Sequence, residues 1–364
     1  MSKAAELAAL IGSQSSLSNR NLIINGAMQV AQRGTSSAGL GAAAGYFTVD
    51  RWSMGLNGTT AGRYTMSQST DAPAGFSKSM KLDVTTADTS IAADELVGFL
   101  QRIEGQDIQR LSKGTPDAKT AVFSFYAKGT PKTFIVEFQD DNSRRFSRTF
   151  TTTTSWQRFE IDVPADTTGE IDDDNTTGLT IIFWFHAGSD YTSGTLQTTW
   201  GGTTTANRAV GCESLFSSTD NELLITGVQL EIGDVATPFE HRSFGDELAR
   251  CQRYTYYTGQ TDSSTFEKMG IGSNISTTQS SVIVFFPVTM RTEPSLTTTG
   301  IAAEYGLYNT GDKQCNAVPS LNTNSTTHIG ACTFQVASGL TSGGCSLAQE
   351  HAGSGAYLIW DAEL

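Results

Sequence analysis

The sequence predicts an all-β protein made of a short N-terminal helix, a jelly-roll β-sandwich, a connector helix and a second, smaller antiparallel β-sandwich. Of the 364 residues only 17% are charged and 36 are glycine, a composition typical of β-sandwiches with many turns. Short apolar segments alternate with Gly- and Thr-rich turns along most of the chain, and long amphipathic helix patterns are absent from it. The length exceeds that of a usual single domain, so two domains are expected.

Residues 1–20 are predicted to form a helical anchor and linker. The segment AAELAALI, residues 4–11, places Leu7, Leu10 and Ile11 on one face of a short helix. Isolated helices shorter than about 12 to 15 residues are marginal in water, so this stripe needs a partner. Copies of itself, another protein or the chain's own body would serve, and a frayed tail is the alternative.

Residues 21–243 are predicted to form the jelly roll. In RFEIDV, Phe159, Ile161 and Val163 alternate with acidic residues, which is the period of a half-buried strand. The segment LTIIFWF, residues 179–185, is apolar on both faces and is expected in the middle of the sandwich.

A short charged segment separates the two β regions. Pro238 has no backbone N–H to donate to a neighbouring strand, so the last strand of the first region is expected to end before it. Ser243, three residues before Asp246, resembles a helix N-cap. We therefore expect a connector helix over 244–253. The preceding EHR, residues 240–242, is interpreted as an ion-paired corner, because no nucleophile and base spacing accompanies it.

Residues 254–364 are predicted to form the second sandwich. The segment SSVIVFFPVTM alternates apolar residues on one face, and AYLIWDAEL closes the chain with another strand.

Charge and cysteine content limit the partners. A net charge of −13 disfavours binding to phosphate backbones, so no nucleic-acid partner is expected. No apolar run approaches the ~20 residues that span a bilayer, and the N-terminus lacks a signal-peptide pattern, which predicts no membrane insertion and synthesis in a cytoplasm. The five cysteines show no CxxC spacing, so no metal site is assigned to them, and one disulfide among Cys315, Cys332 and Cys345 is left open.

Three aromatic residues are candidates for glycan binding, because sugars stack their apolar faces on aromatic rings. They are Trp52, Tyr191 and Trp200, and the last two lie in the loop-like stretch SDYTSGTLQTTWGGTTT. For Trp200, capping the sandwich is the equal alternative. No catalytic residue is assigned, since the chain carries neither a G-x-S-x-G elbow nor a Cys-His set.

The acidic segment EIDDDNTTG, residues 170–178, offers Asp172, Asp173 and Asp174. An EF-hand loop needs glycine at its sixth position, where this segment has Thr177. A solvated loop is the preferred interpretation and structural calcium the weaker one, so no cofactor is expected.

Several segments together resemble a family of bacteriophage structural proteins described as tail fibres or tail-fibre-like. They are NLIINGAMQVAQRG, YFTVDRW, GVQLEIGDVATPFEHRSFGDELARCQRY, VIVFFPVTMRTEPSL and YLIWDAEL. The resemblance implies a virion component with a jelly roll like those of carbohydrate-binding modules. Jelly rolls of that kind often hold calcium through an acidic residue after the opening NG, but Met28 and Gln29 stand here.

The resemblance implies a phage virion protein, made in the host cytoplasm, that is a tail fibre or spike. Its N-terminal helix would mount it on other virion proteins, and its sandwiches would face a host-surface glycan or protein. The stripe of Leu7, Leu10 and Ile11 would form the seam of a homotrimer. The alternative is a capsid decoration protein or head fibre, and a less favoured one is a spike-borne glycan depolymerase, which needs two carboxylates at a set separation.

Overall fold

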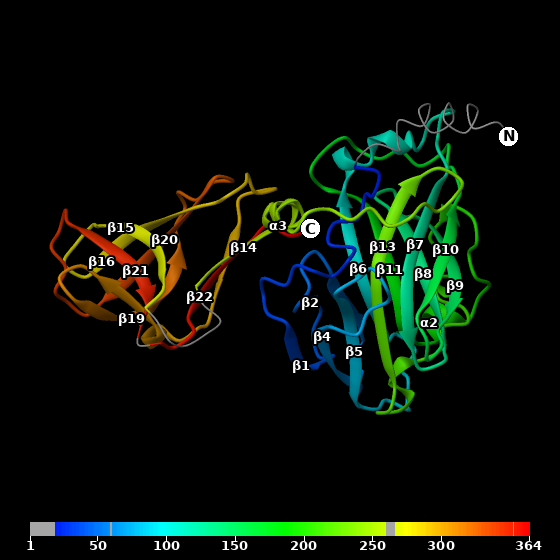
Figure 1. Ribbon diagram of the computed structural model, residues 1–364, viewed down its shortest axis with the longest axis horizontal. Coiled ribbons are helices and arrows are strands. Elements are labelled where there is room, and N and C mark those ends of the chain that lie inside the picture. Colours follow the sequence, from blue (N-terminus) through cyan, green and yellow to red (C-terminus); the bar gives the residue numbers. More distant parts are fainter. Residues whose placement is uncertain (1–18, 59, 260–265, 352) are drawn as a thin grey trace. The chain divides into compact units, whose positions relative to one another are not determined.

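A computed structural model describes residues 19–58, 60–259, 266–351 and 353–364, and it is all-β with few helices (Figure 1). The all-β class predicted from the sequence is therefore confirmed. The chain divides into two compact units. The first contains the described residues up to Ala31, then Thr35–Phe244 and Leu364, and the second contains Gln32–Gly34 and Gly245–Glu363. The expected helix with Leu7, Leu10 and Ile11 lies outside the described residues.

The first unit contains two antiparallel sheets. One has six strands in the order β1 (Ser36–Leu40), β4 (Arg63–Ser69), β5 (Ser79–Thr86), β13 (Glu222–Ile232), β7 (Ala121–Gly129) and β10 (Gln157–Val163). The other has seven, in the order β12 (Gly201–Gly202), β9 (Arg144–Thr151), β8 (Thr133–Asp140), β11 (Thr177–Ala187), β6 (Leu96–Glu104), β3 (Ser53–Asn57) and β2 (Gly45–Tyr46). Short helices lie between strands: η2 (Gly105–Asp107), η3 (Gln109–Leu111), α2 (Ser189–Thr192), η4 (Thr205–Asn207) and η5 (Leu215–Ser217).

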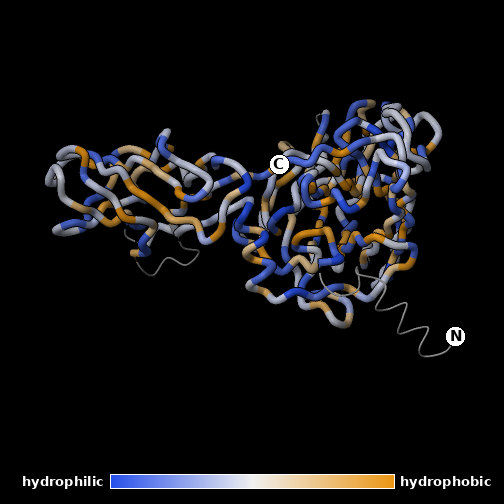
Figure 2. The backbone as a smooth tube through the Cα atoms, turned by 90° about the horizontal axis from the view of Figure 1, so that it is seen from above, coloured by the Kyte–Doolittle hydropathy of each residue, from blue (hydrophilic) through white to orange (hydrophobic). Residues whose placement is uncertain are grey.

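Both sheets contribute to one hydrophobic core that is rich in aromatic rings. Phe123 and Phe125 of β7 contact Phe183 of β11 at centroid distances of 5.8 and 5.0 Å, which joins the two sheets. Strand residues alternate between this core and the outside, as the period of two requires. Figure 2 shows the resulting hydrophobic stretches in orange along the chain.

Strand β11 is buried on both faces, which confirms the expectation for LTIIFWF. Ile181 and Phe183 belong to the core between the sheets. Ile182 and Trp184 point the other way and form a separate cluster with Tyr191 and other residues of the segment that follows β11. That segment covers part of the outer face of the seven-stranded sheet.

The second unit is a closed six-stranded barrel with a three-stranded sheet, and it differs from the sandwich predicted for residues 254–364. The barrel order is β15 (Lys268–Asn274), β16 (Gln279–Phe285), β20 (Ile329–Val336), β19 (Asp312–Leu321), β18 (Tyr305–Tyr308) and β21 (Cys345–Glu350). The small sheet contains β14 (Thr255–Gly259), β22 (Tyr357–Asp361) and β17 (Ser295–Thr298), and η6 spans Ala302–Glu304. Strand β21 pairs with both β15 and β18, so the sheet closes on itself. The prediction of a sandwich failed because the alternation of apolar residues along each strand does not specify which distant strands pair.

The helix α3 (Phe244–Gln252) follows Ser243 in the segment predicted to form the connector. It is the longest helix in the described part of the chain, with nine residues, too few to cross a bilayer. All five cysteines are free thiols, and burial raises the pKa of the Cys332 thiol to about 12.

Candidate functional site

Trp52 is a core residue, so its assignment to glycan binding is wrong. Its ring is fully buried and stacks on Phe99 at a centroid distance of 4.7 Å. The indole Nε1 donates to the backbone oxygen of Asn25 at 3.3 Å. A ring enclosed on all sides cannot stack on a sugar.

Tyr191 is also buried, and the expectation that it presents an exposed ring is wrong. It lies in α2 and packs against Trp184 at 5.2 Å. Its hydroxyl accepts from Asn57 Nδ2 at 3.0 Å. A loop-like sequence here folds back onto the sheet, because the outer face of β11 is apolar and needs cover.

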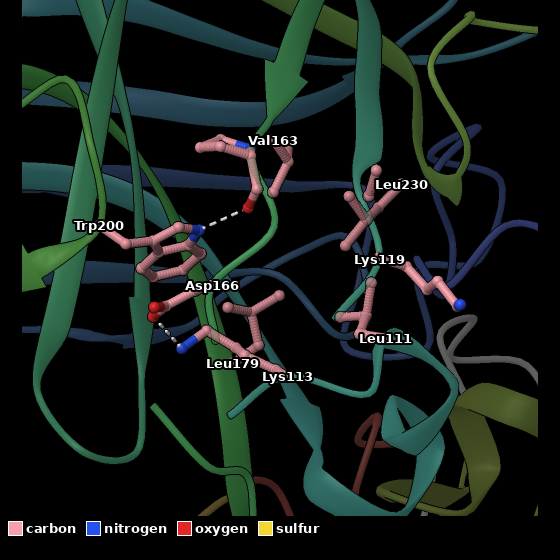
Figure 3. Close-up of a pocket in the computed structure, with 10 residues that line it drawn as sticks. Leu111, Lys113, Lys119, Val163, Asp166, Leu179, Trp200 and Leu230 are labelled. Atoms are coloured by element: carbon pink, nitrogen blue, oxygen red, sulfur yellow. Dashed lines mark hydrogen bonds and ion pairs between the residues drawn. The ribbon is translucent and has the colours of Figure 1, made fainter. Parts of the chain in front are cut away.

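Trp200 lies at one end of the sandwich, where its geometry supports the capping alternative (Figure 3). Its Nε1 donates to the backbone oxygen of Pro164 at 2.8 Å, and its ring makes a T-shaped contact with Phe146 at a centroid distance of 4.7 Å. Lys113 Nζ lies 4.4 Å from the ring centroid and so occupies one ring face. The cavity beside the ring has about 20 Å³ of room, which holds about one water molecule and no sugar.

An ion network lies beside Trp200. Asp166 accepts from Lys113 Nζ at 2.8 Å and from Arg144 Nε and Nη2, on one edge of the guanidinium, at 2.8 and 2.9 Å. Lys113 also pairs with the buried Asp140. Burial alone would raise the pKa of Asp166, but Arg144 and Lys113 outweigh it and lower that pKa to about 2. The network is charge-balanced, which indicates a structural role at this end of the sandwich.

A groove of about 530 Å³ opens elsewhere, on the uncovered part of the outer face of the seven-stranded sheet. This volume is in the range of small-ligand sites. The side chains that line the groove come from β6, β8, β11 and the ends of the adjoining loops. They are Leu100, Arg102, Gln139, Asp140, Asp141, Thr176, Thr177, Thr180 and Ile182.

Two rows of side chains form the floor of the groove. In the first row Thr180 stands directly opposite Gln139 on one side and Arg102 on the other, so the row is polar. In the next row Ile182 stands opposite Leu100 on one side and opposite the ion-paired Glu137 on the other. Leu100 and Ile182 form an apolar pair that borders the groove and also belongs to the covered cluster with Trp184. Directly opposite residues share a face of the sheet, which places the polar strip of the first row beside the apolar pair of Leu100 and Ile182.

Several side chains in and beside the polar strip have donors and acceptors that are not used within the described part of the protein. Within the described residues, the side chains of Gln139, Thr177 and Thr180 make no hydrogen bond. They lie on the neighbouring strands β8 and β11. Polar groups left open in this way are available to a ligand or to water.

The groove ends where the chain covers the sheet. Buried Glu137 pairs with Arg145 and with Arg208, whose Nε lies 3.1 Å from Glu137 Oε2. The Arg208 guanidinium lies 4.6 Å from the Trp184 ring centroid. This ion pair and the covering segment divide the outer face into a closed half and an open half.

The acidic loop expected to be solvated or to hold calcium forms one rim of the groove. The backbone N–H of Asp172 donates to Asp141 at 3.2 Å, and Asp174 accepts from Thr176 at 2.9 and 2.7 Å. Burial, with Asp140 and Asp172 nearby, raises the pKa of Asp141. In the described ranges Asp172, Asp173 and Asp174 do not join any group of three side chains arranged to hold a metal.

The ion-paired corner predicted at residues 240–242 is confirmed. Arg242 Nη2 lies 3.4 Å from Glu240 Oε2 and also donates to the backbone of Asn21, while Glu240 accepts from the N–H of Asn21 at 2.9 Å. Burial alone would raise the pKa of Glu240. The hydrogen bond from the N–H of Asn21 and the positive charge of Arg242 outweigh burial and hold this pKa below its usual range.

The groove residues were missed because the sequence analysis looked for aromatic rings in loops. A usable signal was present in two strands that are otherwise apolar. In TFIVEFQD every second residue faces the core, and Gln139 is one of the polar residues on the opposite face. In LTIIFWF, Thr180 is the one polar residue in an otherwise apolar run. Such outward polar residues are expected to face solvent or a ligand.

No protein-family model matches the sequence, and no curated protein is significantly similar to it. Similar solved structures include the enzymatically active domain of tailspike protein 4 of bacteriophage CBA120, at 13% identity and a TM-score of 0.32. The match covers 59% of this chain and 22% of that one.

Carbohydrate-binding modules are also among the similar structures. One is a family 61 module in complex with β-1,4-galactotriose, at 11% identity and a TM-score of 0.30, covering 59% of this chain and 100% of the module. Another is a family 11 module of Clostridium thermocellum, at 12% identity and a TM-score of 0.28, covering 54% and 99%. Scores this low do not establish the function of this chain.

Proposed function

We propose that this protein binds a glycan, without catalysis, in the groove on the outer face of its seven-stranded sheet. The observation that carries the proposal is the floor of the groove, where the polar row of Arg102, Thr180 and Gln139 lies beside the apolar pair of Leu100 and Ile182. A sugar ring presents C–H groups on its faces and hydroxyls around its edge. The apolar pair suits the first and the open amide and hydroxyl groups suit the second.

The charges around the groove favour a neutral glycan. Arg102 and Asp141 contribute opposite charges, while Asp140 is already paired with Lys113. The groove therefore carries no excess charge that would select a strongly anionic or cationic ligand.

The carboxylates near the groove support binding rather than hydrolysis. Glycoside hydrolysis requires two carboxyl groups that both reach the substrate. Glu137 and Asp140 are held by arginine and lysine, which leaves Asp141 as the groove-lining carboxylate outside an ion pair in the described residues. One such group is insufficient for either the retaining or the inverting mechanism.

The biological setting is proposed from the sequence resemblance to phage tail-fibre proteins. The protein would belong to the virion, mounted through its N-terminal segment on other virion proteins, and would present the groove to the host surface as a homotrimer. Multivalency raises avidity by about 10² to 10⁴ without new contacts, so a shallow site can still hold a cell surface.

The proposal is tested by glycan binding of the full chain. An array of neutral bacterial glycans selects a ligand, and titration calorimetry then compares variants. We expect Gln139→Ala to weaken binding about tenfold and Thr180→Trp, which fills the groove floor, to abolish it. Gln157→Ala is the matched control, because Gln157 lies on β10 of the other sheet. If Gln139→Ala and Gln157→Ala bound the ligand equally well, the groove would not be the site.

A second candidate function, capsid decoration or head fibre, is favoured by the outside of the barrel. Four apolar side chains form one row across the adjacent strands β18, β21, β15 and β16, each opposite the next: Tyr308, Leu347, Ile271 and Ile283. Ile271, Ile283 and Tyr308 are exposed and Leu347 is partly exposed, and apolar surface of this kind is typical of protein contacts. Imaging of labelled particles separates the two functions: label at the tail supports attachment, and label over the whole shell supports decoration.

A further inference from the structure

A buried cluster of three ligand-type side chains lies within the first unit, outside the groove. Asp88, Glu95 and His186 are 4%, 3% and 0% exposed. One carboxylate oxygen of each acid and one imidazole nitrogen lie within 4.8 Å of one another. In the described part of the chain this is the one group of its kind.

The fold brings these residues together from both sheets. Asp88 follows β5 of the six-stranded sheet, whereas Glu95 immediately precedes β6 of the seven-stranded sheet. His186 lies near the end of β11, beyond a bulge that shifts its register so that it pairs with core-facing Val97. A bulge re-aims the side chains that follow it, and here it directs His186 toward the interior.

The imidazole is oriented by a second residue. Ser214 Oγ lies 2.7 Å from His186 Nδ1, and Glu95 Oε2 lies 3.0 Å from His186 Nε2. Ser214 also accepts from the N–H of Phe216 at 3.1 Å and has a lone pair left for Nδ1–H. With the proton on Nδ1, the Nε2 lone pair is directed at Glu95 Oε2, and a cation bound there would contact both atoms; with the proton on Nε2, Ser214 donates to Nδ1 and Nε2–H donates to Glu95.

The charges of the cluster are not balanced by a basic side chain. Asp88 accepts from Thr60 Oγ1, from the N–H of Ala61 and from the N–H of Ser90, and no lysine or arginine of the described residues pairs with either acid. Glu95 is almost completely buried, and its Oε2 lies against the imidazole of His186. Two buried carboxylates and one imidazole keep a net negative charge even when the imidazole is protonated, which is unfavourable without a further cation.

The Ser214, His186 and Glu95 chain does not suit nucleophilic catalysis. Ser214 is the N-cap of η5 and its oxygen already accepts from Phe216 N–H, which lowers its reactivity as a nucleophile. Burial of His186 further excludes a substrate from the imidazole.

We propose that Asp88, Glu95 and His186 bind a divalent zinc ion that joins the two sheets at this end of the first unit. An imidazole with two carboxylates is a zinc donor set, whereas calcium and magnesium prefer oxygen ligands alone. Ser214 acts as a positioning residue that fixes the imidazole ring. The role of the ion is structural, because it would link the loop after β5 to β6 and β11.

The test uses the full chain stripped with chelator and then titrated with Zn²⁺, with Ca²⁺ and Mg²⁺ as comparison ions. We expect one zinc per chain by elemental analysis, and a melting temperature about 5 °C or more higher at 100-fold excess over Kd. His186→Gln and Glu95→Gln should lose the bound zinc. Ser214→Ala should bind zinc about 10 to 100 times more weakly.

His351→Gln is the matched control, because His351 pairs with one carboxylate, Asp312, in the barrel. This variant should retain the zinc. The proposal is overturned if the unsubstituted chain takes up no zinc, if His186→Gln takes up as much as His351→Gln, or if Ca²⁺ raises the melting temperature as much as Zn²⁺ does. Zinc uptake by the unsubstituted chain does not depend on any variant, so its absence would overturn the proposal even if the variants failed to fold.

Discussion

Trp184 in the first unit and Phe285 in the second are both large aromatic residues on the outer faces of strands, yet Trp184 is fully buried and Phe285 is 73% exposed. Trp184 lies under the segment that connects β11 to β13 and contains α2, η4 and η5. Phe285 ends β16 of the barrel, near the similarly exposed Ile271.

The difference shows that strand alternation does not decide which outward residue becomes core. A long connection that folds over the sheet makes a second cluster in the first unit. The barrel satisfies its backbone by closure and leaves its outer apolar residues uncovered. The groove exists because the covering segment reaches only part of the sheet.

The largest expected effect comes from removing the covered ring. Trp184→Ala should lower the free energy of unfolding of the first unit by about 3 to 5 kcal/mol, because it leaves a cavity under the covering segment. The matched change Phe285→Ala should alter the stability of the barrel by less than about 0.5 kcal/mol. Chemical denaturation followed by circular dichroism measures both. Equal losses would contradict the contrast between the covered and uncovered faces.

Asp166 provides the next largest effect. Asp166→Asn should destabilise the first unit by about 3 kcal/mol, since it leaves Arg144 without its bidentate partner and weakens the hold on Lys113. The protein with Asp166 should also lose stability in acid. Its folded pKa of about 2 lies below its ordinary 3.8, so the contribution is present above pH 3.8 and disappears as the pH falls towards 2.

Thermal melts between pH 5 and pH 2 check this dependence. The Asn variant should show a shallower decline over that window than the parent protein does. Parallel declines in both proteins would show that Asp166 does not titrate as proposed.

Gly188 tests the start of the covering segment. A Cβ at this position would lie 2.0 Å from the backbone oxygen of Ala92 and 2.4 Å from that of Ala93, so Gly188→Ala must displace the chain. We expect a loss of about 1 to 3 kcal/mol, measured by denaturant unfolding. Gly245→Ala is the control, because a Cβ there meets open space within α3, and it should be neutral or stabilise slightly.

The smallest effect on stability is expected on the barrel surface. Ile271→Thr combined with Phe285→Ser should change the free energy of unfolding by less than about 0.5 kcal/mol. It should nevertheless reduce self-association in concentrated solution, measured by sedimentation, because it removes exposed apolar area. Unchanged association would show that this face makes no such contacts.

The sequence was most informative where a property is local. The all-β class, the double-sided burial of residues 179–185 and the ion-paired corner at residues 240–242 follow from composition, periodicity and charge order. The assignment of Trp52 and Tyr191 to a binding surface failed, because whether a ring is exposed depends on what folds over it.

The groove and the buried cluster show the same limit. Gln139, Thr180 and Arg102 are 37 to 78 residues apart in pairs but adjacent across β8, β11 and β6, and only the register aligns them. His186 faces inward because of a bulge that leaves no clear mark in the sequence.

The sequence by itself determined that this chain forms strands and which segments are apolar enough to be core. The tertiary structure alone decided that the second region closes into a barrel, which outward residues are covered and which polar residues converge. The physical reason is that hydrophobic periodicity acts between near neighbours along the chain. Strand pairing, closure and coverage depend on contacts between residues far apart in the sequence.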